Sequence, residues 1–524
     1  MQPGQRQLSK PCHCSGHLMA MVSKRSVIGN TALNYAGQAY VMLVGILIMP
    51  FYLGHLGAEA YGLIGFFTVM QAWLQLLDAG LSPSLVRAVA HHQGYPAGNS
   101  HQGRILRSFE IMFLPLAILS ALAVYAASPW IAVHWLNAQT LQPQTLINCI
   151  GLMGVVIALR LYSTLYKSGI QGLEQHAWLN AVNIIIATLR YFGGLLLVSS
   201  FSQDPQDFFE FQVAIAALET LIFASRAWRQ MPVARWLTGI DWQLVRPILP
   251  FAASISLSSV LWIVLTQIDK VLLSEILPLD QYGYFSLVAL ITTGIMMLTN
   301  PLVQALLPRL TVLVAEGSHQ DMHALFLAAN RFVCTFLFPL AAIVALHAEP
   351  LIYAWTGDQA AAQWGRSVLC WYALGSAIMA ASAFQFYLQY AYGQMRLHIW
   401  YSVISALVTV PVMFLAIHYQ AAYGAALAFF FLRAVSFAIW PMIVHQRLAP
   451  GIHGQWLRDI LRISAMTAVG LVCSEPVFQL IAGQSRTTVL LGLAASGLIT
   501  LALVAASYKP LAMKIYFLFS KPST

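Results

Sequence analysis

The segment Leu56-Gly-Ala-Glu-Ala-Tyr61-Gly62 opens one long apolar stretch, and Leu277-Pro-Leu-Asp-Gln-Tyr282-Gly283 opens another. Each residue of the second copy lies 221 positions after its equivalent in the first (282 − 61 = 221). Both copies follow an apolar run of helix length, and the stretches that they open end at Arg87 and Arg309. Duplicated helical bundles are typical of transporters, in which the bundles rock to alternate access to a path between them. The repeat therefore predicts a transporter.

The composition predicts a protein that crosses a membrane many times. Hydrophobic residues make up 59% of the 524 residues and charged residues only 9%. Soluble domains carry roughly 25% charged residues, so this chain has too little charge to cover a globular surface. The net charge of +9 is attributed to Lys and Arg retained in cytoplasmic loops rather than to a nucleic-acid partner.

Apolar runs of about 20 residues indicate about fourteen transmembrane helices and an all-α polytopic fold. The repeat arranges them as two six-helix lobes followed by two extra helices. We expect a leader at 1–25, an N-lobe at 26–228, a cytoplasmic linker at 229–245, a C-lobe at 246–444, the extra helices at 445–508 and a cytoplasmic tail at 509–524.

Loop charge predicts the orientation of the chain. Alternate connections carry Lys and Arg, whereas the 128–143 and 200–207 connections carry none, and only Arg366 and Arg486 break the alternation. Positively charged loops stay in the cytoplasm. Both termini are therefore expected to be cytoplasmic, with an even number of spans between them.

Sequence motifs for enzymes, cofactors and metals are missing. The chain has no phosphate-binding Gly-x-x-x-x-Gly-Lys-Ser/Thr loop, no His-Glu-x-x-His and no Gly-x-Ser-x-Gly. Cys12-His13-Cys14 is the one cysteine cluster, and it lacks a second ligand pair at zinc-finger spacing. We therefore expect no enzymatic activity, metal or cofactor. The leader also lacks a secretory signal, and translation could begin at Met21.

Polar and charged residues recur inside the apolar runs. Asn30, Asn34 and Gln38 are four residues apart and share one face of the first helix, where they either bond a neighbouring helix or line a hydrated cavity. Arg160 and Arg190 lie towards the middle of neighbouring spans and need a carboxylate, a carbonyl or a phosphate as partner. A small excess of cations over carboxylates inside the spans favours an anionic substrate.

Three further charges have alternative explanations. Lys270 lies near a span end, from which its side chain could reach the membrane interface. Asp269 is adjacent to it, so a pair between the two does not follow from their positions on a helix. Arg433 follows three phenylalanines and a leucine, and either a bound anion or a protein partner would explain it.

The start of the chain contains Gly29 to Pro50, then Leu53-Gly54-x-Leu56-Gly57-x-Glu59-x-Tyr61-Gly62, then Leu77-Asp78-x-Gly80-Leu81 with Arg87. In these segments the chain resembles the Wzx-type polysaccharide flippases of the multidrug/oligosaccharidyl-lipid/polysaccharide exporter superfamily. Gln267-Ile-Asp269-Lys270 and Asp280-Gln-Tyr282-Gly283 echo these segments in the second half. The candidate cavity residues are Asn30, Asn34, Gln38, Asp78, Arg87, Arg160, Arg190, Asp269, Lys270 and Arg433.

The resemblance implies a multi-pass protein of the bacterial inner membrane. It would flip undecaprenyl-pyrophosphate-linked oligosaccharide for O-antigen, capsule or exopolysaccharide, with membrane lipid, a polymerase or a chain-length regulator as partners. The first helix lacks the dense cations of the lipid II branch, which argues against a peptidoglycan precursor. The alternatives are a cation-coupled multidrug exporter of the same superfamily, a lipid II or sporulation-type flippase, a membrane glycosyltransferase, polymerase or ligase of the same pathway, and a structural scaffold.

Overall fold

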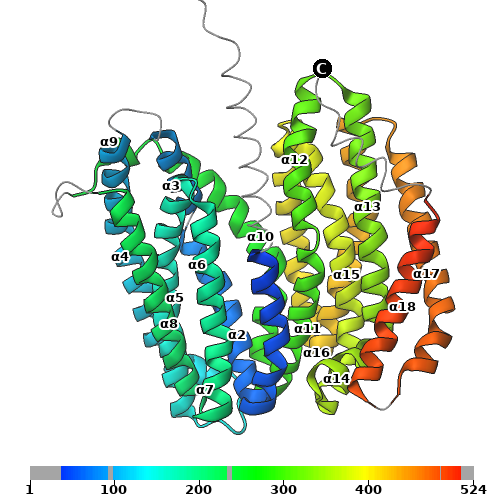
Figure 1. Cartoon of the computed structure of the whole chain (residues 1–524), viewed down its shortest axis with the longest axis horizontal. Coiled ribbons are helices and arrows are strands. Elements are labelled where there is room, and N and C mark those ends of the chain that lie inside the picture. Colours follow the sequence, from blue (N-terminus) through cyan, green and yellow to red (C-terminus); the bar gives the residue numbers. More distant parts are fainter. Residues whose placement is uncertain (1–36, 79, 93–97, 233–238, 484, 509–524) are drawn as a thin grey trace, which may run out of the picture.

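The computed structural model describes residues 37–78, 80–92, 98–232, 239–483 and 485–508, and in these segments the chain is helical without a strand. Figure 1 shows two groups of helices side by side, with α2 and α10 between them. We refer to the helices up to α8 as the first bundle and to those from α10 onward as the second bundle. The first bundle consists of the helix Gly37–Leu56, α2 (Ala58–Leu74), the 3₁₀ turn Gln75–Asp78, α3 (Leu81–His92), α4 (Gly98–Trp130), the π-helical turn Ile131–Trp135, α5 (Pro143–Gly172), α6 (His176–Thr188), the π-helical turn Leu189–Gly193, α7 (Gly194–Ser200) and α8 (Pro205–Gln230).

A short helix, α9 (Trp242–Val245), precedes the second bundle. The second bundle consists of α10 (Leu249–Ile276), α11 (Leu279–Met297), α12 (Asn300–Ala315), α13 (His319–Leu346), α14 (Ala348–Thr356), α15 (Gln359–Ala391), α16 (Met395–Leu448), α17 (His453–Ile481) and α18 (Arg486–Ala506).

The helices account for the predicted spans. Twelve helices in the described part of the chain are long and apolar enough to cross a membrane. One of them, α16, reverses direction at Gln420 and Ala421, so its two arms are separate spans. Counting the two arms separately gives thirteen spans, and the 19-residue α11, which is not among the twelve, lies between α10 and these arms in the chain. The apolar stretch that the first repeat copy opens, and that ends at Arg87, is not one continuous helix, because Gly80 adopts a positive φ of 70° between the 3₁₀ turn and α3.

The two copies of the repeat cross each other where α2 meets α11. A Cβ added at Gly62 would lie 2.1 Å from the carbonyl oxygen of Leu279, and one added at Gly283 would lie 2.4 Å from that of Ala58. Both pairs are related by the 221-residue offset (283 − 62 = 279 − 58 = 221). Only glycine permits this approach of one backbone to another, as in other closely packed membrane helices. The motif thus places a pseudo-twofold crossing at the junction of the bundles.

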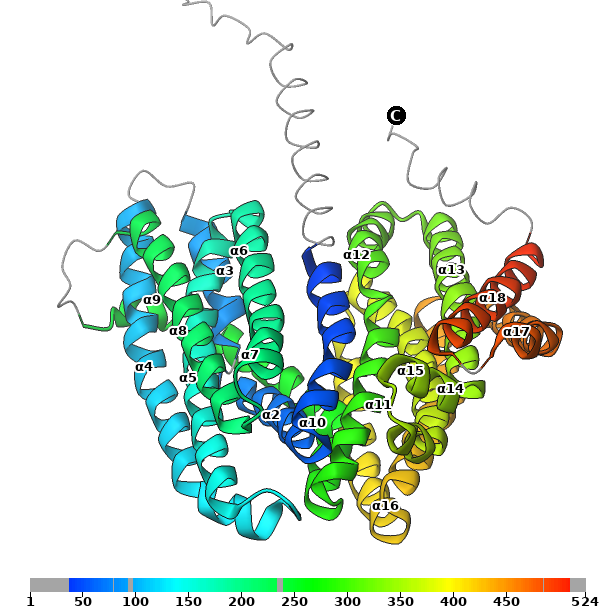
Figure 2. The same cartoon turned by 60° about the horizontal axis from the view of Figure 1, so that its bottom comes forward.

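Further bonds join the bundles at the same end, which we call the joined end and define by the turns at 136–142 and 277–278. The Leu279 amide donates to the carbonyl of Asn137 at 2.9 Å, and the side-chain amide of Asn137 donates to the carbonyl of Glu275 at 2.6 Å. The Trp135 indole donates to the Ser274 hydroxyl at 2.9 Å. Figure 2 shows the two groups of helices close together at this end and diverging toward the other.

Glu59 of the repeat motif holds the turn that makes these bonds. Its carboxylate accepts the backbone amides of Gln139, Thr140 and Leu141 and the hydroxyl of Thr140, at 2.7–3.0 Å. A carboxylate bonded to several backbone N–H groups forms strong, charge-assisted hydrogen bonds. The glutamate in the motif therefore orders the 139–141 segment beside the second bundle.

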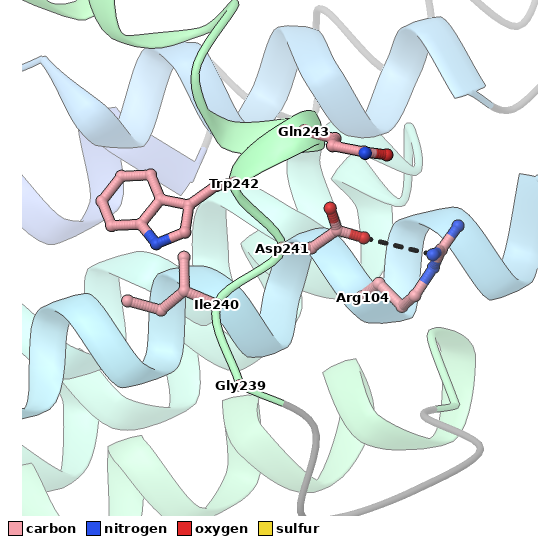
Figure 3. Close-up of a pocket in the computed structure, with 6 residues that line it drawn as sticks. All are labelled: Arg104, Gly239, Ile240, Asp241, Trp242 and Gln243. Carbon is pink, nitrogen blue, oxygen red and sulfur yellow. Dashed lines mark hydrogen bonds and ion pairs between the residues drawn. The ribbon is translucent and has the colours of Figure 1, made fainter.

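The end of the expected 229–245 linker is fastened to the first bundle. Asp241 accepts a hydrogen bond from Arg104 of α4 at 3.1 Å, as Figure 3 shows, and its backbone amide donates to the hydroxyl of Ser108 at 2.9 Å. The same side chain caps α9 through the amide of Leu244. A cavity of about 400 Å³ lies beside this contact. The path to α10 therefore leaves from the side of α4.

Candidate functional site

Two pairs of polar side chains connect α5 and α8 inside the first bundle. Arg160 and Lys167 are seven residues apart on α5, and Gln212 and Glu219 are seven apart on α8, so each pair lies on one helical face. The Arg160 guanidinium donates to the Gln212 side chain at 3.3 Å, and the Lys167 ammonium pairs with the Glu219 carboxylate. Arg160 also donates to Gln71 of α2 at 2.6 Å. Three helices therefore converge on one group of cations.

Arg190 joins this group from a local irregularity of the helix that carries it. It is the second residue of the π-helical turn Leu189–Gly193, and its guanidinium donates to Glu219 at 2.6 Å. Turns of this kind occur as single bulges inside α-helices, frequently at functional sites. The Tyr52 hydroxyl of the first helix donates to the backbone carbonyl of Tyr191 at 2.8 Å and so braces the bulge.

The resulting first cluster, Arg160, Lys167, Arg190 and Glu219, carries three cations and one carboxylate. The side chain of Glu219 is 4% exposed, whereas those of Lys167 and Arg190 are 29% and 22% exposed. The guanidinium NH₂ groups of Arg160 bond neutral amides, whereas Lys167 and Arg190 both pair with the carboxylate. With both basic types protonated, the cluster has a net charge of about +2. It is chemically suited to hold a multiply charged anion.

The second cluster, Asp269, Lys270 and Arg433, lies in the second bundle. The Tyr372 hydroxyl donates to Asp269 at 2.7 Å, and Lys270 lies 3.3 Å from both oxygens of the same carboxylate. Arg433 is buried and donates to the carbonyl of Leu265 at 2.7 Å. This cluster has one cation more than it has carboxylates.

Asp269 and Lys270 form a pair that their adjacency did not predict. The lysine chain turns back along its own helix, because its ammonium also donates to the carbonyl of Thr266, four residues earlier, at 2.8 Å. In that position it reaches the neighbouring carboxylate. Lys270 is 16% exposed. Its ammonium thus bonds residues of its own helix, α10. The sequence had left open that the side chain extends to the membrane interface instead.

The remaining candidates are not members of the two clusters or fall outside the described residues. Asp78 accepts the backbone amide and the hydroxyl of Ser82, at 3.1 and 2.7 Å, and so caps the start of α3. Arg87 is exposed on α3 and Gln38 is exposed on the first helix. Asn30, Asn34 and the Cys12-His13-Cys14 group fall in the part of the chain that is not described.

Lys167 and Glu219 were not among the candidate cavity residues, although Glu219 is one of the charged residues inside the apolar runs. Their signal was present in the sequence, because Arg160 and Lys167 repeat at the same seven-residue interval as Gln212 and Glu219. The π-helical turn that presents Arg190 has no comparable sequence signal. Among the described residues, no three His, Cys, Asp or Glu side chains gather in a way that could hold a metal ion.

Comparison with known proteins agrees with this architecture. The chain is similar to a structure of the lipid II flippase MurJ in an inward closed conformation, with a TM-score of 0.71 and 12% identity over 92% of this chain and 100% of that one. An inward-facing multidrug resistance MATE family transporter has a TM-score of 0.61 and 14% identity, over 78% and 96% of the two chains. The DinF-BH multidrug transporter in complex with R6G has a TM-score of 0.55 and 13% identity, over 80% of this chain and 94% of that one.

These structural likenesses, all at low identity, show a common fold. No curated protein sequence matches the chain. The model of the polysaccharide biosynthesis protein family matches residues 27–314, which is more than half of the 524 residues and includes both copies of the repeat motif. The chain, a multi-pass helical membrane protein, belongs to the polysaccharide biosynthesis protein family.

Proposed function

We propose that this protein flips a polyprenyl-pyrophosphate-linked oligosaccharide across the bacterial inner membrane, for assembly of a surface polysaccharide such as O-antigen, capsule or exopolysaccharide. The supporting observation is the excess of cations in the first cluster, where Lys167 and Arg190 share the one carboxylate of Glu219. A pyrophosphate that links two groups carries about two negative charges. Arginine and lysine are the side chains best suited to bind it.

Charge in the loops gives the direction of the proposed movement. With both termini in the cytoplasm, the joined end faces the periplasm, and the end where the bundles diverge faces the cytoplasm. The head group would enter from the cytoplasmic side and meet the first cluster, with Lys270 and Arg433 supplying positive charge from the opposite bundle. The polyprenyl tail would stay in the bilayer. Rocking of the bundles would then separate the joined end and release the head group outward.

The clusters fit the alternative functions less well. A cation-coupled drug exporter needs carboxylates that are able to accept a cation, whereas Glu219 and Asp269 each already contact a cation. A glycosyltransferase or polymerase would position carboxylates beside a sugar acceptor, and neither cluster has carboxylates in excess. A polymerase or a chain-length regulator would instead act after this protein, as a partner that receives the translocated repeat unit.

The test is deletion of the gene followed by complementation. In the deletion strain, surface polysaccharide and the complete lipid-linked repeat units held in the inner leaflet are measured together by mass spectrometry and leaflet-specific labelling. Loss of the polymer with accumulation of complete, inward-facing repeat units supports the proposal and identifies the oligosaccharide by mass. Unchanged lipid-linked pools with altered drug sensitivity would refute it.

A matched pair of variants tests the role of the first cluster. Arg160→Gln removes the cation whose NH₂ groups bond neutral amides, and Arg366→Gln removes a cation from an exposed pair with Glu349 on the second bundle. Exposed ion pairs contribute little to stability, so the second variant is a control for charge and insertion. We expect Arg366→Gln to complement the deletion and Arg160→Gln to fail at equal membrane abundance.

A further inference from the structure

Glu219 occupies the binding groups that a substrate phosphate would need. One carboxylate oxygen pairs with the ammonium of Lys167, and the other accepts from the guanidinium of Arg190 at 2.6 Å. Carboxylate and phosphate oxygens compete for the same donors, because both accept short, charge-assisted hydrogen bonds from lysine and arginine. An arriving phosphate therefore must share these donors with Glu219 or displace it.

The members of the first cluster differ in how strongly they are already engaged. The NH₂ groups of Arg160 donate to the side-chain amides of Gln71 and Gln212, so its positive charge has no carboxylate partner. Lys167 and Arg190 are held by Glu219, and parts of both cationic side chains remain exposed. Arg160 is thus the member that can bind an anion without displacing a carboxylate, and the other two become available only as Glu219 gives way.

We infer that Glu219 is an internal counter-ion that competes with the substrate phosphate for Lys167 and Arg190 and so limits the affinity of the site. A transport site must bind its cargo strongly enough to load it and weakly enough to release it. Three uncompensated cations would retain a pyrophosphate. The carboxylate returns to Lys167 and Arg190 as the phosphate leaves, which offsets the loss of the anion. This inference rests on the proposed function, because it assumes a phosphate-bearing substrate.

A purely structural Glu219 makes the opposite prediction. If the carboxylate only braced α5, α8 and the π-helical turn against one another, its removal would leave two cations unpaired and would misplace them. The affinity for an anion would then fall. An increase in affinity on removal of Glu219 therefore separates the counter-ion from the brace.

The experiment measures binding of inorganic pyrophosphate to the purified full-length protein in lipid nanodiscs, by isothermal titration calorimetry. We expect Glu219→Gln to bind roughly tenfold more tightly than the wild type, the change equivalent to about one added charge-assisted hydrogen bond. The matched control is Glu210→Gln, which removes an exposed carboxylate from the same helix and should leave the affinity unchanged. Transport by Glu219→Gln should be slower in spite of the tighter binding, so this variant should restore less surface polysaccharide to the deletion strain than the wild type does.

A second variant protects the test against misfolding. Glu219→Asp keeps the charge but is one methylene shorter, so it cannot hold both cations equally well, and its affinity should lie between those of the wild type and the glutamine variant. The inference is overturned if the wild type binds pyrophosphate, Arg160→Gln weakens that binding, and both Glu219 variants bind no more tightly than the wild type. Absence of binding by the wild type and all variants would instead overturn the proposed function, and the inference with it.

Discussion

Substituting alanine for Gly62 or Gly283 should separate the bundles at the joined end. The added Cβ would lie 2.1 Å from the carbonyl oxygen of Leu279 in the first variant and 2.4 Å from that of Ala58 in the second. An ordinary carbon–oxygen contact is about 3.3 Å, so the helices must move apart by roughly 1 Å. The opposing atoms are backbone atoms and cannot rotate away.

The size of the effect follows from the cost of overpacking. Inserting one methyl group into a close-packed contact costs about 1–3 kcal/mol. If the contact exists only while the joined end is closed, the closed state loses this amount and the equilibrium shifts by roughly 5- to 150-fold toward separation. The two variants should behave alike, because Gly62 and Gly283 are equivalent residues of the repeat.

The assay is a distance distribution by double electron–electron resonance. Spin labels at Gln142 and Glu275 report across the joined end, because both residues are exposed and lie on opposite bundles. Gly54→Ala is the matched control, since a Cβ at Gly54 meets no atom within 4 Å and any gain in helix propensity is common to all three variants. A longer distance should become more populated in both test variants. Well-folded Gly62→Ala and Gly283→Ala proteins with the same distribution as Gly54→Ala would refute the reasoning.

Three further predictions concern single side chains. Arg160→Gln should reduce transport by about tenfold or more without lowering the thermal midpoint, since it removes one of several mutually repelling cations; flux of labelled lipid-linked oligosaccharide and thermal unfolding measure the two effects, and a large loss of stability would contradict this. Glu59→Gln should cost about 2 kcal/mol, because an amide replaces the charged acceptor of four donors; a chemical denaturation midpoint equal to that of the wild type would count against it. Burial lowers the pKa of His347 below its ordinary value of 6.5, against the opposing effect of Glu475. The unfolded state then binds more protons, so stability should fall as the pH drops below about 6.5, and His347→Gln should flatten the dependence of the thermal midpoint on pH.

The repeat and the hydropathy were sufficient to predict the fold, because both are properties of the whole chain. The offset between Tyr61 and Tyr282 predicted two equivalent bundles, and the glycines that follow these tyrosines make the crossing between them. The break at Gly80 was missed, because the apolar pattern continues across it. A positive φ at one glycine changes the helix without changing its hydropathy.

The candidate site was predicted less completely, for reasons that are local. Arg160 and Arg190 were identified from the cost of a charge inside a membrane, whereas their meeting depends on how α5, α6 and α8 pack. The partners of Glu219, Lys167 and Arg190, lie on other helices. A single sequence shows the spacing of residues along one helix but not which helices are neighbours, so it could not identify these pairs. Arg190 approaches Glu219 through a π-helical turn, which adds one residue to a turn and rotates the following side chains.

The two bundles share their backbone plan but not their chemistry. The positions 221 residues after Arg160, Lys167 and Glu219 are Ala381, Leu388 and Trp440, so the duplicated scaffold carries apolar residues where the first bundle carries its charges. The glycine crossing, in contrast, is present in both copies. When the bundles separate at this symmetric contact, both move in equivalent ways. An anion that is bound mainly by one bundle, in contrast, moves together with that bundle. Under the proposed function, release depends on weakening the hold of the first bundle on the anion, and this is the step in which we infer that the carboxylate of Glu219 competes.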